Sequence, residues 1–369
     1  VAAARALAQA AGARAAEVVL LLDEGVLLDF MMDWPGSRAR AEEADALVAA
    51  TPLLGTPAIL ARLHMARGRT HMRANQFAEA IAAFGQAAEA AEQAGDDGYE
   101  ALAQTLAMWA FSAGSIGRHQ EGNETINRCI TLAEQHGDMI GVAVALQNRG
   151  VTSFLTGNVD RFVADFERVV QIAREYGFAM SECCAVRDLA EVSLVLGRTD
   201  EAMAHAQRAH EMYTQQLGTA SRIVYAVDVQ IARIAAYQGD LATAETIVRR
   251  VIALQAEARA AGRNELLLVD GERVLLDATD FLLRGDSDAQ FDALAARGRE
   301  LQLQPPDLVE ILEWKGLSAL RAGRVAAGLT FLADALAAAD GTPAAGRVQR
   351  RIAQARREAS APRRAGNAS

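Results

Sequence analysis

Three arginines with helical spacing carry the clearest binding chemistry in this sequence. Arg62, Arg69 and Arg73 are separated by seven and four residues, a spacing that places them on one stripe of a helix. A guanidinium group donates paired hydrogen bonds to a carboxylate or a phosphate. In a chain with a net charge of −10, the stripe predicts a site for an acidic ligand. The alternative is that the arginines solvate a helix face or pair with Glu79 or the acidic residues 96–97.

No catalytic or metal-binding pattern accompanies these arginines. The sequence has no glycine-rich phosphate loop, no GxSxG, no HExxH and no CxxC, which are the spacings that such chemistry requires. His64 and His71 share a helical face but have no convincing third ligand nearby. Cys183 and Cys184 are more simply packing residues than a redox pair. The sequence therefore predicts a protein that is not an enzyme and that holds no metal or cofactor.

Charge and hydropathy argue against other classes. A net charge of −10 argues against a nucleic-acid-binding body, although residues 341–369 carry seven arginines and one glutamate. No apolar run approaches the roughly 20 residues that a membrane span needs. No basic region precedes a continuous apolar stretch, as it would in a secretory signal. We expect a cytoplasmic protein with neither a membrane nor a nucleic-acid partner.

The helices that position the arginines belong to a unit of about 40 residues that recurs along the chain. Apolar residues inside the units recur at i, i+3 and i+4, and residues 58–304 contain no proline. Such a pattern predicts an all-α solenoid of about seven or eight antiparallel helix pairs. The predicted turns fall at Gly36, Asn75, Gly117, Gly157, Gly197, Gly239, Gly285 and Gly323.

The clearest unit, residues 61–94, resembles the tetratricopeptide repeat (TPR). That family places small residues where two helices cross and apolar residues around them. The unit matches the family pattern with Gly68, Asn75, Phe77, Ala80, Phe84 and Ala87. With weaker copies, the resemblance covers roughly residues 15–340, and the period exceeds the usual 34 residues. In this the chain is similar to the C-terminal repeat regions of bacterial signalling ATPase and kinase regulators. The resemblance implies a right-handed, TPR-like superhelix whose first helices line a concave groove.

The position of a residue within the family repeat (its register) implies whether its side chain faces a ligand in that groove. The second, fifth, ninth, twelfth and thirteenth positions of each first helix would do so, and Gln230 is added as a neighbour one place off register. The resulting residues are Arg62, Met65, Arg69, Met72, Arg73, Gln104, Phe111, Gln147, Val151, Phe154, Arg187, Glu191, Gln230, Arg233 and Tyr237. Arginines and aromatic residues together suit an extended protein or peptide ligand with acidic residues or a free C-terminus. The lysine and asparagine set with which this family holds carboxylates is absent, so binding of chaperone tails is not implied.

Three segments are expected along the chain. Residues 1–57 form a degenerate N-terminal capping repeat, residues 58–340 form the TPR-like repeats, and residues 341–369 form a basic C-terminal helix and a disordered tail. The resemblance implies a non-catalytic scaffold for protein–protein interaction or ligand sensing, as the C-terminal part of a bacterial signal-transduction protein. The alternatives are a free-standing adaptor, a repeat-built enzyme, and a nucleic-acid regulator that uses the basic tail. The oligomeric state stays open.

Overall fold

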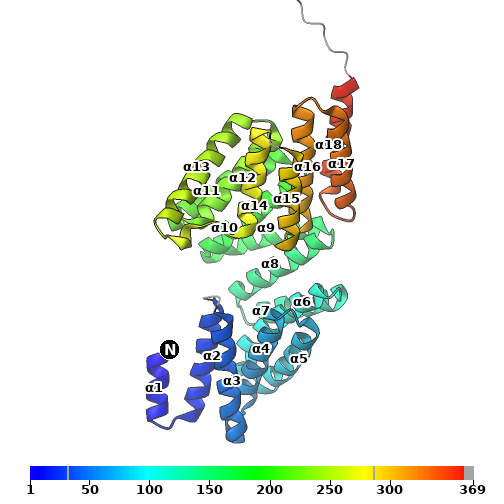
Figure 1. The fold of residues 1–369 in the computed structure, drawn as a ribbon. Helices are drawn as coiled ribbons and strands as arrows, with labels where there is room; N and C mark the ends of the chain where they lie inside the picture. The colour runs from blue at the N-terminus through cyan, green and yellow to red at the C-terminus, as the bar shows by residue number, and fades with distance from the viewer. Residues whose placement is uncertain (31–32, 286, 361–369) are drawn as a thin grey trace, which may run out of the picture. The chain divides into compact units, whose positions relative to one another are not determined.

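The computed structural model describes residues 1–30, 33–285 and 287–360, which form eighteen α-helices and no strand (Figure 1). The all-α prediction is therefore confirmed. The chain divides into two compact units, the first over Val1–Thr152 and the second from Ser153 onward. Within the described residues, no helix combines the length and the apolar character that crossing a bilayer requires. The tail predicted to be disordered lies outside the described residues beyond position 360.

The first unit is a row of helix pairs. Helices α2 and α3, α4 and α5, and α6 and α7 pack against each other as neighbours in sequence. Its helices are α1 (Ala2–Ala10), α2 (Arg14–Phe30), α3 (Trp34–Ala50), α4 (Pro57–Arg73), α5 (Phe77–Ala94), α6 (Tyr99–Ser115), α7 (His119–Gln135) and most of α8 (Met139–Leu155).

The second unit continues the same alternation and ends in one additional helix. Helices α10 and α11, α12 and α13, and α16 and α17 pack as pairs, and α18 packs on α17. Its helices are α9 (Val159–Tyr176), α10 (Ala179–Val195), α11 (Thr199–Leu217), α12 (Arg222–Gln238), α13 (Leu241–Ala260), α14 (Asp270–Arg284), α15 (Asp288–Glu300), α16 (Pro305–Arg321), α17 (Val325–Ala338) and α18 (Ala345–Ser360).

Two of the helix pairs cross so closely that only glycine fits at the crossing point. A Cβ atom on Gly68 of α4 would lie 2.3 Å from the ring of Phe84 on α5, which is fully buried. The same relation recurs in the last pair, where a Cβ on Gly316 would lie 2.8 Å from Leu332. The small residues that suggested the repeat are therefore there to admit a large side chain from the partner helix.

Most of the predicted turns are confirmed. Gly117, Gly157, Gly197, Gly239, Gly285 and Gly323 have φ between 71° and 85°, and Asn75 has φ 57°. This left-handed conformation ends the first helix of a pair and favours glycine or asparagine. The turn predicted at Gly36 is wrong, because Gly36 lies in the first turn of α3. Its N–H donates to the Asp33 carboxylate at 3.0 Å, which caps that helix.

Substitution of Gly68 by alanine tests the close crossing. Alanine gains about 0.5–1 kcal/mol of helix propensity, but overpacking against the Phe84 ring costs about 1–3 kcal/mol. We expect Gly68→Ala to lower the free energy of local unfolding of α4 and α5, measured by native-state hydrogen exchange.

Gly85→Ala is the matched control on α5. A Cβ there meets only the Trp109 ring at 3.8 Å, an ordinary contact, so we expect a gain of about 0.5–1 kcal/mol. A stabilised Gly68→Ala variant would contradict the close crossing.

Candidate functional site

A cavity of about 760 Å³ in the first unit runs along four helices, α2, α4, α6 and α8, each of which is the first helix of its pair. It is lined by Val26 and Asp29 of α2, Arg69 and Arg73 of α4, Tyr99, Glu100, Ala103, Gln104, Ala107 and Met108 of α6, Cys129 of α7, Asp138, and Ile140, Gly141, Val144, Ala145 and Asn148 of α8. We call this cavity the unit 1 groove.

Apolar side chains line one side of the unit 1 groove without being covered by the protein. Ile140 and Val144 on α8 are 55% and 44% exposed, although such residues are usually buried. Two small side chains of α6, Ala103 and Ala107, also line the groove. The groove therefore offers apolar contact to a ligand side chain, with charged residues on α2, α4 and α6.

The predicted arginine stripe is partly neutralised by acids on α2. Arg62 donates to Asp23, and Arg69 Nε lies 3.0 Å from Asp29 Oδ2 with both side chains about one-tenth exposed. Burial lowers the pKa of Arg69, and the nearby positive charge of Arg73 acts in the same direction. The alternative of intramolecular pairing thus holds for two of the arginines, with α2 acids as partners.

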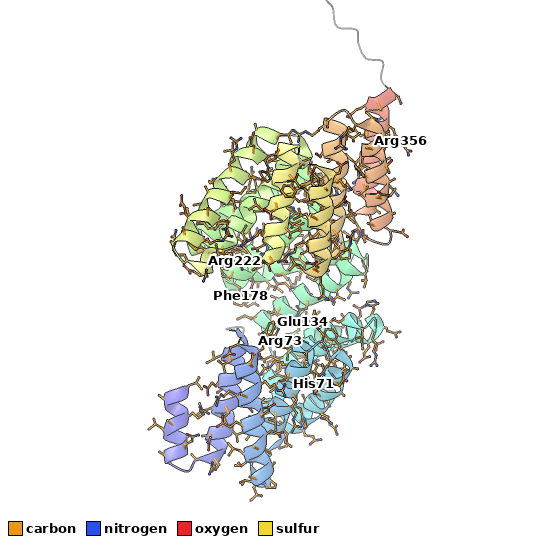
Figure 2. The ribbon with its side chains drawn as sticks, in the orientation of Figure 1. His71, Arg73, Glu134, Phe178, Arg222 and Arg356 are labelled. Atoms are coloured by element: carbon orange, nitrogen blue, oxygen red, sulfur yellow. The ribbon has the colours of Figure 1, made fainter. Side chains whose placement is uncertain are left out.

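Arg73 differs from the other two arginines. It ends α4, its side chain is exposed, and its guanidinium lies 5.3 Å from the centre of the Trp34 ring (Figure 2). A cation over an aromatic face keeps its hydrogen-bond donors at the ring edge available. Arg73 also lines the unit 1 groove, so it is the arginine of this stripe best placed to meet a ligand carboxylate.

A tyrosine and an aspartate that family register did not select complete the unit 1 groove. Tyr99 donates to Asp138 Oδ2 at 2.8 Å, and the other Asp138 oxygen accepts the Gly141 N–H at 2.8 Å. Burial and this hydrogen bond to an anion raise the pKa of Tyr99. The Tyr99 ring stacks on His136 with centroids 3.9 Å apart. These bonds tie the start of α6 to the start of α8.

Two signals in the sequence could have identified the groove residues that were missed: one for Tyr99 and Asp138, and another for Val144. Tyr99 and Asp138 are 39 residues apart, as are Arg62 and Asp23, so a polar contact between neighbouring units appears as a pair of complementary residues one repeat apart. The register used for the groove also places Val144 at the second position of its unit, where it was not selected.

The other predicted residues of the first unit are distributed differently. Gln104 lines the groove, whereas Met65 is buried and Met72 and Gln147 are half-buried. Phe111 and Val151 are exposed, at 56% and 44%, outside the lining of the groove. The structure therefore brings Arg69, Arg73 and Gln104 together, and contact of the remaining residues with a partner stays a prediction.

In the second unit, predicted groove residues meet in a buried ionic cluster. Arg233 on α12 is 4% exposed and donates to both oxygens of Glu191 on α10 at 2.8 and 3.0 Å. It also donates to both oxygens of Glu310 on α16 at 2.7 and 2.9 Å. Gln230 donates to Glu191 at 2.9 Å. One guanidinium therefore joins three helices by two bidentate ion pairs, the geometry for which arginine is suited.

A second arginine, from α18, enters the same interior. Arg347 is 4% exposed, donates from Nε to Glu313 Oε2 at 2.9 Å, and lies over the Tyr237 ring at 4.7 Å. Tyr237 donates to the same Glu313 oxygen at 3.0 Å. Of the predicted residues, Glu191, Gln230, Arg233 and Tyr237 are thus brought together here. Arg187 pairs instead with Asp188 at 2.9 Å, and Phe154 packs on Phe162 at 5.6 Å.

The charges of this cluster shift the pKa of Asp307, which lies in the first turn of α16. Burial, together with the negative charges of Glu191 and Glu310, raises its pKa to about 7, against the opposing effect of Arg233 and Arg347. Burial likewise raises the pKa of the Cys129 thiol to about 11. Across the described residues, no group of three histidine, cysteine or acidic side chains is arranged to hold a metal ion.

The repeated helix pairs and their crossings define a TPR-like helical-repeat protein. Residues 61–93 match the family model of the tetratricopeptide repeat, the unit that the sequence singled out. Comparison with curated proteins by sequence finds no significant match.

The solved structures with the same fold include Rap proteins. Aspartyl phosphate phosphatase F from Bacillus subtilis aligns over 83% of this chain and 76% of its own, with a TM-score of 0.65 and 10% identity. A Rap protein complexed with competence and sporulation factor aligns over 92% of this chain and 99% of its own, with a TM-score of 0.58 and 14% identity. The Rap conjugation gene regulator of the plasmid pLS20, in complex with a peptide, aligns over 92% of this chain and 97% of its own. Its TM-score is 0.57 and its identity is 13%. At these identities the likeness shows the fold alone.

Arg233→Ala tests the weight of the buried cluster. Removal of Arg233 leaves Glu310, which is 1% exposed, with only the longer contact of 4.0 Å to Arg347, and breaking a buried ion pair in this way costs about 3–5 kcal/mol. The control is Arg249→Ala, which removes a 76% exposed partner of Glu245 and should cost at most about 1 kcal/mol. Denaturant unfolding of the second unit measures both changes, and equal losses would contradict the assigned network.

Asp307→Asn tests the pH dependence that this cluster imposes. Because the folded-state pKa lies above the ordinary 3.8, the folded unit binds more protons than the unfolded chain between about pH 4 and 7, and stability falls as pH rises through that window. The substitution removes this penalty, so it should raise the unfolding temperature at about pH 8 and change it little at about pH 4.

Asp288→Asn should change the unfolding temperature at about pH 8 in the opposite direction to Asp307→Asn. Arg324 donates to both Asp288 oxygens at 2.6 and 2.8 Å and lowers the pKa of that carboxyl. Its contribution is present above the ordinary pKa and is lost as pH falls. The variant should therefore unfold at a lower temperature than the parent at about pH 8. A gain for Asp288→Asn, or none for Asp307→Asn, would refute the assignment.

Proposed function

We propose that this chain is a non-catalytic, peptide-sensing module of bacterial signal transduction, which binds its ligand in the unit 1 groove. The observation that carries the proposal is the groove itself, which spans α4, α6 and α8 and exposes Ile140 and Val144. A protein rarely leaves such side chains together on a surface unless something covers them. Contact with a ligand peptide would bury them.

The ligand chemistry follows from the charges around the groove. Arg73 suits a carboxylate, either an acidic side chain or a free C-terminus, whereas Glu100 on α6 suits a basic group. Because Asp29 already neutralises Arg69, acidic character in the ligand is needed only next to Arg73. We therefore infer a short extended segment with apolar side chains and one well-placed carboxylate, in place of a uniformly acidic peptide.

Structural relatives support a ligand of this kind. One Rap relative was solved with competence and sporulation factor and another with a peptide. By analogy the bound state would pass to an effector domain, with this chain as the C-terminal, cytoplasmic part of such a protein. A free-standing adaptor is the second candidate. A catalytic role is supported only by the name of one relative, a phosphatase, whose likeness shows the fold alone.

Val144→Asp tests the unit 1 groove. A displayed library of short random peptides, selected on the unmodified chain, should yield ligands with apolar residues and a carboxylate. A carboxylate in place of Val144 would have to be desolvated against these apolar residues, so we expect affinity to fall at least tenfold, about 1.4 kcal/mol. Arg73→Ala should weaken only those ligands that carry the carboxylate.

Val151→Asp is the matched control. Val151 lies on the same helix, α8, and is also 44% exposed, but it does not line the groove. Ligands should bind this variant as they bind the parent chain. Unchanged binding by Val144→Asp, or loss by Val151→Asp alone, would place the site elsewhere.

A further inference from the structure

Helix α18 docks on helices that are far from it in sequence. Arg347 Nη1 donates to the carbonyl oxygen of Leu194 at 3.1 Å, and Arg350 donates to that of Leu196. These carbonyls belong to the C-terminal end of α10, 153 and 154 residues earlier in the chain. A helix that only terminated the array would need to cover α17 alone.

The apolar face of α18 binds the same surface. Val348 is fully buried and Ile352 is 8% exposed, in one cluster with Val195 of α10 and Val309 of α16. Arg356, one turn beyond Ile352 on α18, is exposed (Figure 2). This is how an amphipathic helix binds a groove formed by other helices. Leu332 and Ala335 of α17 belong to the same cluster. We call the surface formed by α10, α12, α16 and α17 under α18 the unit 2 face.

The unit 2 face presents acceptors that fit arginine. The last carbonyls of α10 carry the partial negative charge of a helix end, and the Glu313 carboxylate is fully buried beside them. The Tyr237 ring receives two guanidinium groups, Arg347 at 4.7 Å and Arg351 at 5.8 Å. Carbonyl, carboxylate and aromatic face together match the planar, five-donor fork of arginine better than the point charge of lysine.

The fit of α18 to this face is incomplete. Among the described residues, Arg347 Nη2 and Glu313 Oε1 have no hydrogen-bond partner although both atoms are buried, and Arg351 Nε of α18 approaches that Glu313 oxygen only to 3.8 Å. A buried polar atom left unsatisfied weakens an interface. In addition, a cavity of about 750 Å³ runs beside α18 and is lined by Tyr237, Leu282, Leu317, Leu320 and Arg351. The unit 2 face is therefore larger than the helix that occupies it.

We propose that the unit 2 face is a receptor for an arginine-bearing amphipathic helix and that α18 is a ligand held in cis. The partner is a helix of another protein with arginines at the spacing of Arg347, Arg350 and Arg351, which would displace α18 and bind in its place. This site is independent of the unit 1 groove, and it gives the chain a second mode of recognition that is closed until α18 leaves.

The test is to open the face in the full chain and supply the helix in trans. Arg347→Ala removes the buried anchor, and a fluorescent peptide of residues 341–360 is the probe. We expect the peptide to bind the Arg347→Ala chain at least tenfold more tightly than the unmodified chain, in which α18 competes. A peptide that itself carries Arg347→Ala should lose that binding.

Arg356→Ala is the control for an effect of net charge alone, because it removes one positive charge from an exposed position of α18. A peptide with this change should bind the opened chain as well as the unmodified peptide does. An Arg356→Ala chain should stay closed to the probe. Equal losses for the Arg347→Ala and Arg356→Ala peptides would show non-specific attraction to an acidic protein and overturn the proposal.

Hydrogen exchange of the unmodified chain gives a second, mutation-free readout. If α18 is a cis ligand, its amides should exchange through an opening that leaves α10, α12 and α16 protected. Exchange of all four helices in one cooperative step would make α18 part of the core and overturn the proposal. Loss of protection throughout the second unit in Arg347→Ala would do the same, as would an Arg347→Ala chain in which α18 stays protected and the probe does not bind.

Discussion

Close approach of paired helices is the constraint on which this architecture depends. Gly68 and Gly316 leave room for Phe84 and Leu332, so these two pairs bury a large side chain at the crossing. The left-handed turn that follows must then return the chain within a few residues, which explains why glycine or asparagine recurs there. Pairs built in this way present their first helices as neighbours, and both proposed binding surfaces, the unit 1 groove and the unit 2 face, are made mostly from those first helices.

This constraint is visible in sequence, which is why the fold could be predicted. Small residues, turn residues and apolar residues recur at a fixed period, and the periodicity needs no knowledge of distant contacts. The exceptions are local. Gly36 was read as a turn although Asp33 caps the helix there. Tyr99 was passed over because it lies in the residues by which these long units exceed the shorter family repeat, ahead of the positions to which family register applies.

The site residues were harder to predict because the position of a residue in the repeat determines which face of its helix it occupies, but not which residue it pairs with. Arg62 and Arg69 do share a stripe, yet their charges are used by Asp23 and Asp29 on α2. Arg233 also lies on a first helix, but Glu310 meets it from 77 residues further along. A bend that brings α12 against α16 depends on the sum of many small rotations between units. No single motif encodes that sum, so the burial of this arginine could not be anticipated.

The sequence separation of 153 positions between Leu194 and Arg347 has a consequence for synthesis on the ribosome. Each helix pair makes mostly local contacts and can form soon after it emerges, because loop closure is short. Glu313 then spends the interval before position 347 is translated with an incomplete set of counter-charges. During that interval the nascent second unit exposes an acidic, partly apolar surface. Premature contacts of that surface are a hazard of vectorial folding, and translation speed near the end of α17 sets how long the hazard lasts.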